Sequence, residues 1–203
     1  MANFIRSLAS QPATRRHFER RILANTSPQH LLSVISDVGK YEQFLPLCNA
    51  SKVLTRSSCG NHYDASLQIG LPGSSAFQDE YVSRVSVNAN ASPGEMSVEA
   101  RSVKSNLFDS LSSRWKLREV AADANRMDSS DNNCNQGVST YVEFEVELSV
   151  SNPVVVAVLD SVLEEVAGRQ VQAFEDRCRE LFANNLEAEQ KNPTKGENIV
   201  GLR

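Results

Sequence analysis

The chain has 203 residues, of which 40% are hydrophobic and 23% are charged, and its formal net charge at pH 7 is -4. This length suits one domain with tails, and the composition supports a packed core and excludes a chain that is disordered throughout. Domains that bind nucleic acid are usually strongly basic, so the negative charge argues against nucleic acid as the main partner. The longest nearly apolar run, NPVVVAVL, is far shorter than the ~20 residues of a transmembrane helix.

Cysteine and histidine usage gives little sign of chemistry. The four cysteines are scattered, and no two of them form a C-x-x-C pair, so neither a zinc site nor a redox dithiol is predicted. The three histidines have no partner at metal-ligand spacing, and no motif of a hydrolase, a metalloprotease or a nucleotide-binding loop is found. We therefore predict no metal, no catalytic cofactor and no catalytic residue. We also predict reduced thiols, with two disulfides as the alternative.

The start of the chain is basic. Residues 1–21 carry five arginines with serine and threonine between them, and Glu19 is the one acidic residue. An Arg- and Ser-rich, acid-poor start is typical of an organellar transit peptide, and a plain basic leader is the alternative. We assign residues 1–17 to this leader.

A strand and a helix are predicted next. Residues 18–25, FERRILAN, have a short β-like core. Ser27 suits the N-cap of a helix and Pro28 suits its first position. Apolar side chains then recur at helical spacing, which predicts a helix over residues 28–38, followed by a short turn that ends before Pro46.

Six segments alternate between apolar and polar residues with a period of two, which is typical of β-strands. They are residues 51–57, 62–70, 76–89, 95–103, 113–121 and 139–150. In the last segment, valine, phenylalanine and leucine alternate with tyrosine and glutamate, which indicates an antiparallel strand with one wet face. Residues 122–137 are polar, and we expect a mobile loop there.

From Asn152 onward the apolar period changes from two to 3.6. A stripe of apolar residues that begins at Val155 predicts a helix of roughly seven to eight turns, and residues 184–203 are expected to form a disordered polar tail. One long helix with so wide a stripe must cover the concave face of a curved sheet. The predicted fold class is therefore α+β, with a curved antiparallel sheet wrapped around a long C-terminal helix and room for an apolar cavity between them.

A few polar or aromatic residues could serve a site. Asp79 shares a strand face with Tyr81, so it is either a buried acid that needs a partner or a solvated residue near the strand end. Gln170 interrupts the apolar stripe of the last helix, and it could hydrogen-bond a ligand carbonyl or simply contact backbone. Trp115, the single tryptophan, suits the core better than the wall of a cofactor site.

Seven segments, in order along the chain, resemble the mitochondrial coenzyme Q-binding proteins, a branch of the START-like, polyketide-cyclase-type superfamily. They are FERRIL, YEQFLPLCNASKV, DASLQIGLPG, DEYVSRVSV, RWKLREV, VEFEVELS and LEEVAGRQVQAFEDRCRELF. The resemblance runs from Phe18 to Phe182, and its most specific parts are Y-x-x-F-x-P-x-C from Tyr41 and F-E-x-R from Phe174. Gln170 departs from it, because a more apolar residue would be expected there.

The resemblance implies a helix-grip fold, with residues 18–183 as a START-like lipid-binding domain around a hydrophobic tunnel. It also implies binding of ubiquinone (coenzyme Q) as a bound lipid, support of respiratory electron transfer, and peripheral attachment to the matrix face of the mitochondrial inner membrane. With that location, the basic leader is interpreted as a mitochondrial transit peptide.

The expected tunnel lining follows from the inward positions of the strands and the last helix. It comprises Leu67, Ile69, Tyr81, Val85, Trp115, Phe144, Val146, Leu163, Val166 and Gln170.

The tunnel mouth is expected where the first helix ends, at Phe44, Leu45, Pro46 and Leu47. These side chains would contact lipid, or they would simply plug the open end of the sheet. Lys52, just past them, could touch a head-group oxygen or a lipid phosphate, or it could be a solvated strand lysine.

We therefore expect a non-enzymatic protein that binds coenzyme Q while it touches the membrane and presents the quinone to respiratory or biosynthetic complexes. Burial is worth ~0.8 kcal/mol per CH₂ group, so each isoprene unit would cost roughly 4 kcal/mol to expose to water. One alternative is a cyclase or aromatase of the same superfamily, for which Asp79, Tyr81 and Arg101 are the available acid–base groups. A second alternative is a ribosome-associated interaction protein.

Overall fold

The computed structural model describes residues 12–70, 78–120 and 138–191. Within these residues seven strands, two α-helices and one 3-10 helix follow one another. They are β1 (Ala13–Leu23), α1 (Pro28–Ser36), η1 (Val38–Gln43), β2 (Cys48–Arg56), β3 (His62–Gly70), β4 (Gln78–Ser92), β5 (Glu95–Lys104), β6 (Ser110–Val120), β7 (Ser139–Val150) and α2 (Pro153–Lys191).

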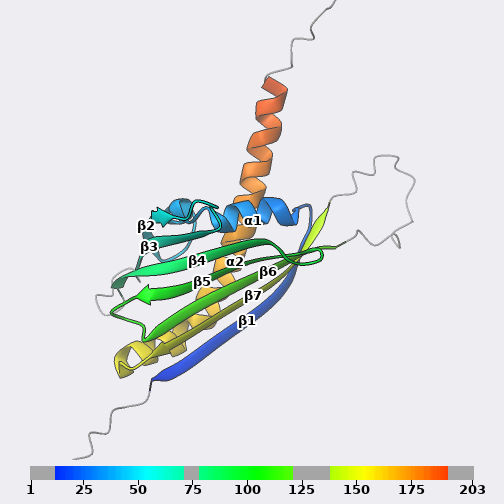
Figure 1. Cartoon of the computed structure of the whole chain (residues 1–203). Helices are drawn as coiled ribbons and strands as arrows, with labels where there is room; N and C mark the ends of the chain where they lie inside the picture. Colours follow the sequence, from blue (N-terminus) through cyan, green and yellow to red (C-terminus); the bar gives the residue numbers. More distant parts are fainter. Residues whose placement is uncertain (1–11, 71–77, 121–137, 192–203) are drawn as a thin grey trace, which may run out of the picture.

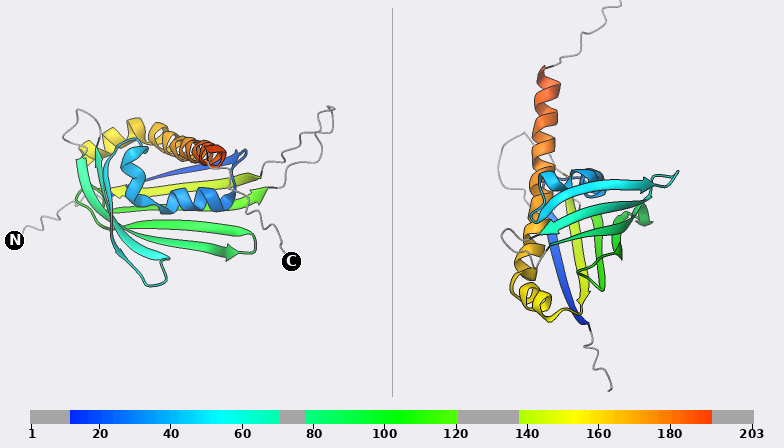
Figure 2. Two further views of the ribbon diagram at one scale, coloured as in Figure 1. Left: turned by 90° about the horizontal axis from the view of Figure 1, so that it is seen from above. Right: turned by 90° about the vertical axis from the view of Figure 1, so that its left-hand side faces the viewer.

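The strands form one antiparallel sheet in the order β1-β7-β6-β5-β4-β3-β2. The first two strands occupy opposite edges, and α1 with η1 connects them. The sheet curves, and α2 crosses its concave side (Figures 1 and 2). This arrangement confirms the predicted α+β helix-grip fold.

The two helix starts form as the sequence predicts. The Ser27 hydroxyl accepts a hydrogen bond from the backbone N–H of His30 at 3.2 Å, and Pro28 occupies the first turn of α1. In the same way, the Asn152 side chain accepts a hydrogen bond from the N–H of Val154 at 2.9 Å at the start of α2. Each cap satisfies one backbone donor that the helix itself leaves free.

The expected start of the domain is corrected by five residues. β1 begins at Ala13, so residues 13–17, which we assigned to the leader, form part of an edge strand paired with β7. Arg15 and His17 take inward positions in this strand, and Phe18 takes an outward one. The side chains of this segment therefore alternate between the two faces of the sheet, as in any β-strand. The strand was predicted only from residue 18, because arginine and histidine carry little β-strand signal. Residues 1–11 lie outside the described part.

The expected tail is corrected as well. α2 continues to Lys191, so residues 184–191 are helical and only the rest of the tail, residues 192–203, lies outside the described part. Residues 186–191, LEAEQK, are strong helix formers, and polarity alone was a poor reason to end the helix. Figure 1 shows this end of α2 projecting beyond the sheet. The loop predicted over 122–137 also lies outside the described residues.

The buried core is divided into two hydrophobic clusters. The larger one contains Trp115, Phe144 and Phe174 with the buried side of α1. The smaller one contains Phe108 and Leu159, with neighbours at the start of α2 and the ends of the central strands. Since most domains have one contiguous core, this division raises the question of what lies between the clusters.

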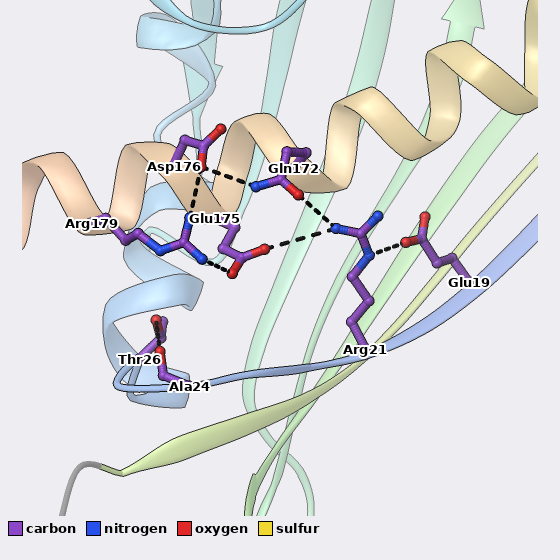
Figure 3. A network of polar contacts seen from close by, with 8 residues as sticks. All are labelled: Glu19, Arg21, Ala24, Thr26, Gln172, Glu175, Asp176 and Arg179. Carbon is purple, nitrogen blue, oxygen red and sulfur yellow. Dashed lines mark hydrogen bonds and ion pairs between the residues drawn. The ribbon is translucent and has the colours of Figure 1, made fainter.

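A polar network attaches α2 to the edge strand β1 (Figure 3). Arg21 on β1 contacts Glu19, donates to the Gln172 side chain at 2.9 Å, and lies 3.8 Å from a Glu175 oxygen. Arg179, one turn further along α2, contacts Glu175 too. The inner face of β1 is thus held to the last helix by charges, whereas the central strands face it with apolar side chains.

Candidate functional site

A cavity of about 190 Å³ lies between the concave face of the sheet and α2, and it separates the two core clusters. Its walls come from α1, η1, strands β2 to β7 and α2. From the larger cluster it is bordered by Trp115 and Val98, and from the smaller by Phe108 and Leu159. Of its described lining residues, none is Asp, Glu, His, Lys or Arg.

Small side chains explain why this space stays open. Ser83, Ala100 and Ser113 occupy inward positions on three neighbouring strands, β4, β5 and β6, and Ala167 faces them from α2. In the strand register, Ala100 lies opposite Ser113, and the next inward position along β6 is the large Trp115. The small side chains at the centre of the concave face therefore leave a gap below the helix, and the larger side chains on either side of them fill the space up to the helix.

Nine of the ten residues predicted to line the tunnel border this cavity. They are Leu67, Ile69, Tyr81, Val85, Trp115, Val146, Leu163, Val166 and Gln170. Phe144 does not: it is 1% exposed, and its ring packs against that of Trp115 with centroids 4.3 Å apart. Trp115 itself is both core and wall, because Phe144 and Phe174 pack against it while it borders the cavity.

Three of the five residues predicted at the mouth border the cavity, namely Leu45, Pro46 and Leu47. Phe44 faces elsewhere: its ring packs edge-on against Phe174 at 5.3 Å. Lys52 is exposed on β2 and does not border the cavity, whereas the side chain of its neighbour Val53 packs against the core. A contact between this mouth and a membrane stays a prediction.

The backbone at the predicted mouth is held in an unusual shape. Leu47 has a positive φ of 65°, a conformation that costs a non-glycine residue about 1–3 kcal/mol and persists only where its surroundings fix it. The ring of Pro46 fixes the φ torsion of that residue, directly before Leu47. The Leu47 carbonyl accepts a hydrogen bond from the N–H of Gly70 at 3.0 Å. The apolar cluster between η1 and β2 is thus tied to the end of β3.

The titratable groups that border the cavity are two tyrosines and a cysteine. Burial raises the pKa of Tyr41 and of Tyr81 above the ordinary tyrosine range. Burial and the nearby charge of Glu42 raise the pKa of Cys48 to about 11. All three groups are therefore neutral at physiological pH, and the Tyr41 hydroxyl already donates to the backbone carbonyl of Ile35.

The other candidate acid–base groups lie elsewhere. Asp79 accepts hydrogen bonds from the Ser105 hydroxyl and from the N–H groups of Asn106 and Leu107, so it caps the turn between β5 and β6. Arg101 is exposed on β5, 3.7 Å from Glu99. Of the three groups considered for an enzyme, only Tyr81 borders the cavity.

The sequence analysis missed several lining residues. The small ones, Ser83, Ala100 and Ser113, each occupy an inward position of a predicted strand, and that run of small residues in otherwise large-residue positions was the available signal. Ile35 and Val38 were recognised only as one face of the first helix. The described cysteines, Cys48, Cys59 and Cys178, have free thiols.

Comparison with known proteins adds the family context. The family model described as "Polyketide cyclase / dehydrase and lipid transport" matches residues 25–175. The mitochondrial coenzyme Q-binding protein COQ10 of Dictyostelium discoideum is 23% identical over 153 residues, which cover 75% of this chain and 64% of that protein. The chain thus spans less than two thirds of this relative's length.

Two further matches are a sequence relative and a solved structure. The persistence and stress-resistance toxin PasT of Escherichia coli O6:H1 is 24% identical over 164 residues, covering 81% of this chain and 87% of the toxin. A START superfamily protein from Mycobacterium smegmatis superposes with a TM-score of 0.59 at 16% identity, covering 82% of this chain and 98% of that structure. None of the described helices has the length and apolar character needed to cross a membrane.

Proposed function

The chain belongs to the polyketide cyclase / dehydrase and lipid transport family, and we propose that it binds ubiquinone in its central cavity and carries it without chemical change. The observation that supports this most strongly is the cavity itself, which has an apolar wall, no charged lining residue among those described, and leucine and proline side chains at its predicted mouth. Such a wall suits an uncharged ring lipid and disfavours an ionic substrate, whose charge would be left unpaired.

The size of the cavity decides how much of the lipid it holds. A cavity of about 150 Å³ is large enough for benzene, so 190 Å³ matches one ring and little of a tail. The tail must then leave past Leu45, Pro46 and Leu47. Since exposing each isoprene unit to water costs roughly 4 kcal/mol, the carrier works while its mouth touches a bilayer.

We place this activity at the matrix face of the mitochondrial inner membrane, where the quinone would be presented to respiratory or biosynthetic complexes. The mitochondrial relative named for coenzyme Q binding supports this location. Four of the five arginines of the basic start, Arg15, Arg16, Arg20 and Arg21, lie in β1, so the proposed location rests on this relative.

An enzymatic cyclase or aromatase role is less well supported by the site. Acid–base catalysis needs a group whose pKa lies near the working pH, and the three titratable groups at the cavity have raised pKa values. Asp79 is engaged in a turn, and Arg101 is exposed and paired with Glu99.

Lipid extraction from the purified full chain, produced in a host that makes ubiquinone, tests the proposal. We expect close to one quinone per protein for the natural chain. Ala100→Phe should lose the quinone because a phenyl ring fills the cavity. Ala89→Phe, an exposed position on β4, is the matched control and should retain it.

Three outcomes would contradict the proposal. A folded natural chain that yields no isoprenoid quinone argues against quinone binding, and equal recovery from Ala100→Phe argues against the cavity as its site. Turnover of a polyketide or quinone precursor would favour the cyclase alternative. Co-sedimentation of the purified chain with ribosomes, in place of quinone binding, would favour a toxin-like role.

A further inference from the structure

Four polar side chains border the cavity without a hydrogen-bond partner among the described residues. Among the described residues no hydrogen bond involves the hydroxyls of Tyr81, Ser83 or Ser113 or the amide of Gln170, although all four border the cavity. Buried polar groups in folded proteins are nearly always paired. The only fully occluded, unpaired side-chain atoms in the described part belong to two residues of β1 outside the cavity. The four groups therefore have space in front of them for an atom of a ligand.

These groups approach the cavity from different sides. Ser83 lies on β4 and Ser113 on β6, and Ala100 on the intervening strand β5 is the direct neighbour of Ser113. Gln170 approaches from α2, on the opposite wall. Ser83 lies opposite Ser102, two residues from Ala100 along β5. Two strand spacings of about 4.8 Å and this offset of about 7 Å along the strands place the two serines about 12 Å apart.

We infer that Ser83 and Ser113 hold the two opposite oxygens of a para-quinone ring that lies over Ala100, with Gln170 as a further donor from the helix. Two hydrogen bonds of about 2.8 Å and an oxygen-to-oxygen span of about 5 Å across the ring require donors about 11 Å apart, close to the diagonal separation of the two serines. The inference rests on the proposed function and fixes the orientation: the head group is innermost, and the tail leaves at Leu47.

The chemistry of the donors fits this ligand class. A hydroxyl group both donates and accepts hydrogen bonds, so the two serines can pair with the carbonyls of a quinone or with the hydroxyls of its reduced form. Burial raises the pKa of Tyr81, so its hydroxyl keeps its proton and remains a donor near the mouth. The apolar lining between these groups suits contact with methyl and methoxy substituents.

Calorimetric titration of the full chain tests the inference with two ligands. One is a ubiquinone with a single isoprene unit, and the other is the same molecule with both ring carbonyl oxygens removed. The test variant is Ser83→Ala combined with Ser113→Ala. The matched control is Ser97→Ala combined with Ser112→Ala, which changes outward positions on β5 and β6.

We expect the test variant to bind the quinone roughly 5- to 150-fold more weakly, since each of the two neutral hydrogen bonds contributes about 0.5–1.5 kcal/mol. Its affinity for the analogue without the ring carbonyl oxygens should equal that of the natural chain, and the control should match the natural chain with both ligands. Unchanged quinone affinity would overturn the inference. So would an equal loss for both ligands, because that would indicate a reshaped cavity.

The design separates this inference from the proposed function. A natural chain that binds neither ligand contradicts the proposed function itself. A natural chain that binds both ligands equally well keeps an apolar ring site and overturns the hydrogen-bonding assignment. Thermal unfolding followed by circular dichroism verifies folding, and if the double variant does not fold, the two single variants are compared in the same way.

Discussion

At the scale of single residues, the volume of a few side chains decides whether the molecule is hollow. Ser83, Ala100 and Ser113 occupy positions where the flanking rows carry Tyr81 or Trp115. Interiors are normally packed with few voids, so leucine at any of these positions would be the ordinary way to close the core. Their smallness costs packing contacts, and that cost is offset when a ligand ring occupies the space.

Cysteine reactivity gives a prediction at the same scale. The thiolate is the reactive form, and burial raises the pKa of Cys48 to about 11, while the hydrogen bond from the Ser57 hydroxyl lowers the pKa of the exposed Cys59. At pH 8 we therefore expect iodoacetamide to alkylate Cys59 more than ~100-fold faster than Cys48. The rate at Cys48 should rise with pH until about 11.

Peptide mass spectrometry of a time course measures both rates separately. Cys59→Ser is the control: it removes the faster-reacting thiol, and the alkylation rate at Cys48 should stay the same. Comparable rates at the two positions at pH 8 would show that Cys48 is open to water, which contradicts the burial that raises its pKa.

At the scale of elements, the attachment of α2 to the sheet differs from strand to strand. The central strands contact α2 through apolar side chains and leave the cavity there, whereas β1 holds it through Arg21 and its partners (Figure 3). Partly buried ionic contacts are more sensitive to the loss of one partner than exposed pairs are. The edge strand β1 therefore fixes the position of α2 above the cavity, because the open space itself offers the helix no packing contacts.

Arg21→Met should lower the free energy of unfolding by about 1–3 kcal/mol, because hydrogen bonds to charged groups contribute this much and Glu19 would lose its partner. Arg20→Met, at the next position of the same strand, is the control. Arg20 is exposed and lies 3.3 Å from Glu143, so we expect about 1 kcal/mol or less. Urea unfolding of both variants measures the difference, and equal losses would show that the network does not hold the helix.

At the scale of the whole molecule, two core clusters meet at a cavity instead of merging. The period of two in the strands and of 3.6 in the last helix predicted the element order, because each element buries one face. The start of β1 and the end of α2 were missed because charged residues at Arg15 and beyond residue 184 hide the periodicity. The start of β1 also pairs with β7, which only the fold brings beside it.

The sequence predicted those residues of the candidate site whose direction follows from the alternation of side chains along a strand. Inward positions of strands predicted most of the lining, whereas Phe144 failed because a second layer, Trp115, lies in front of it. Phe44 and Lys52 failed because the direction of a side chain in an irregular turn or beside a β-bulge does not follow from spacing. β2 indeed carries register shifts on both sides of Lys52.

The central claim is that a quinone ring enters the space between the sheet and α2. Trp115 is the single tryptophan of the chain and forms part of the cavity wall, so its fluorescence reports a quinone in contact with it. Titration with a short-chain ubiquinone should quench this fluorescence saturably at one ligand per chain, and Ala100→Phe should abolish the saturable phase. Quenching that is absent in the natural chain, or identical in Ala100→Phe, would contradict the account.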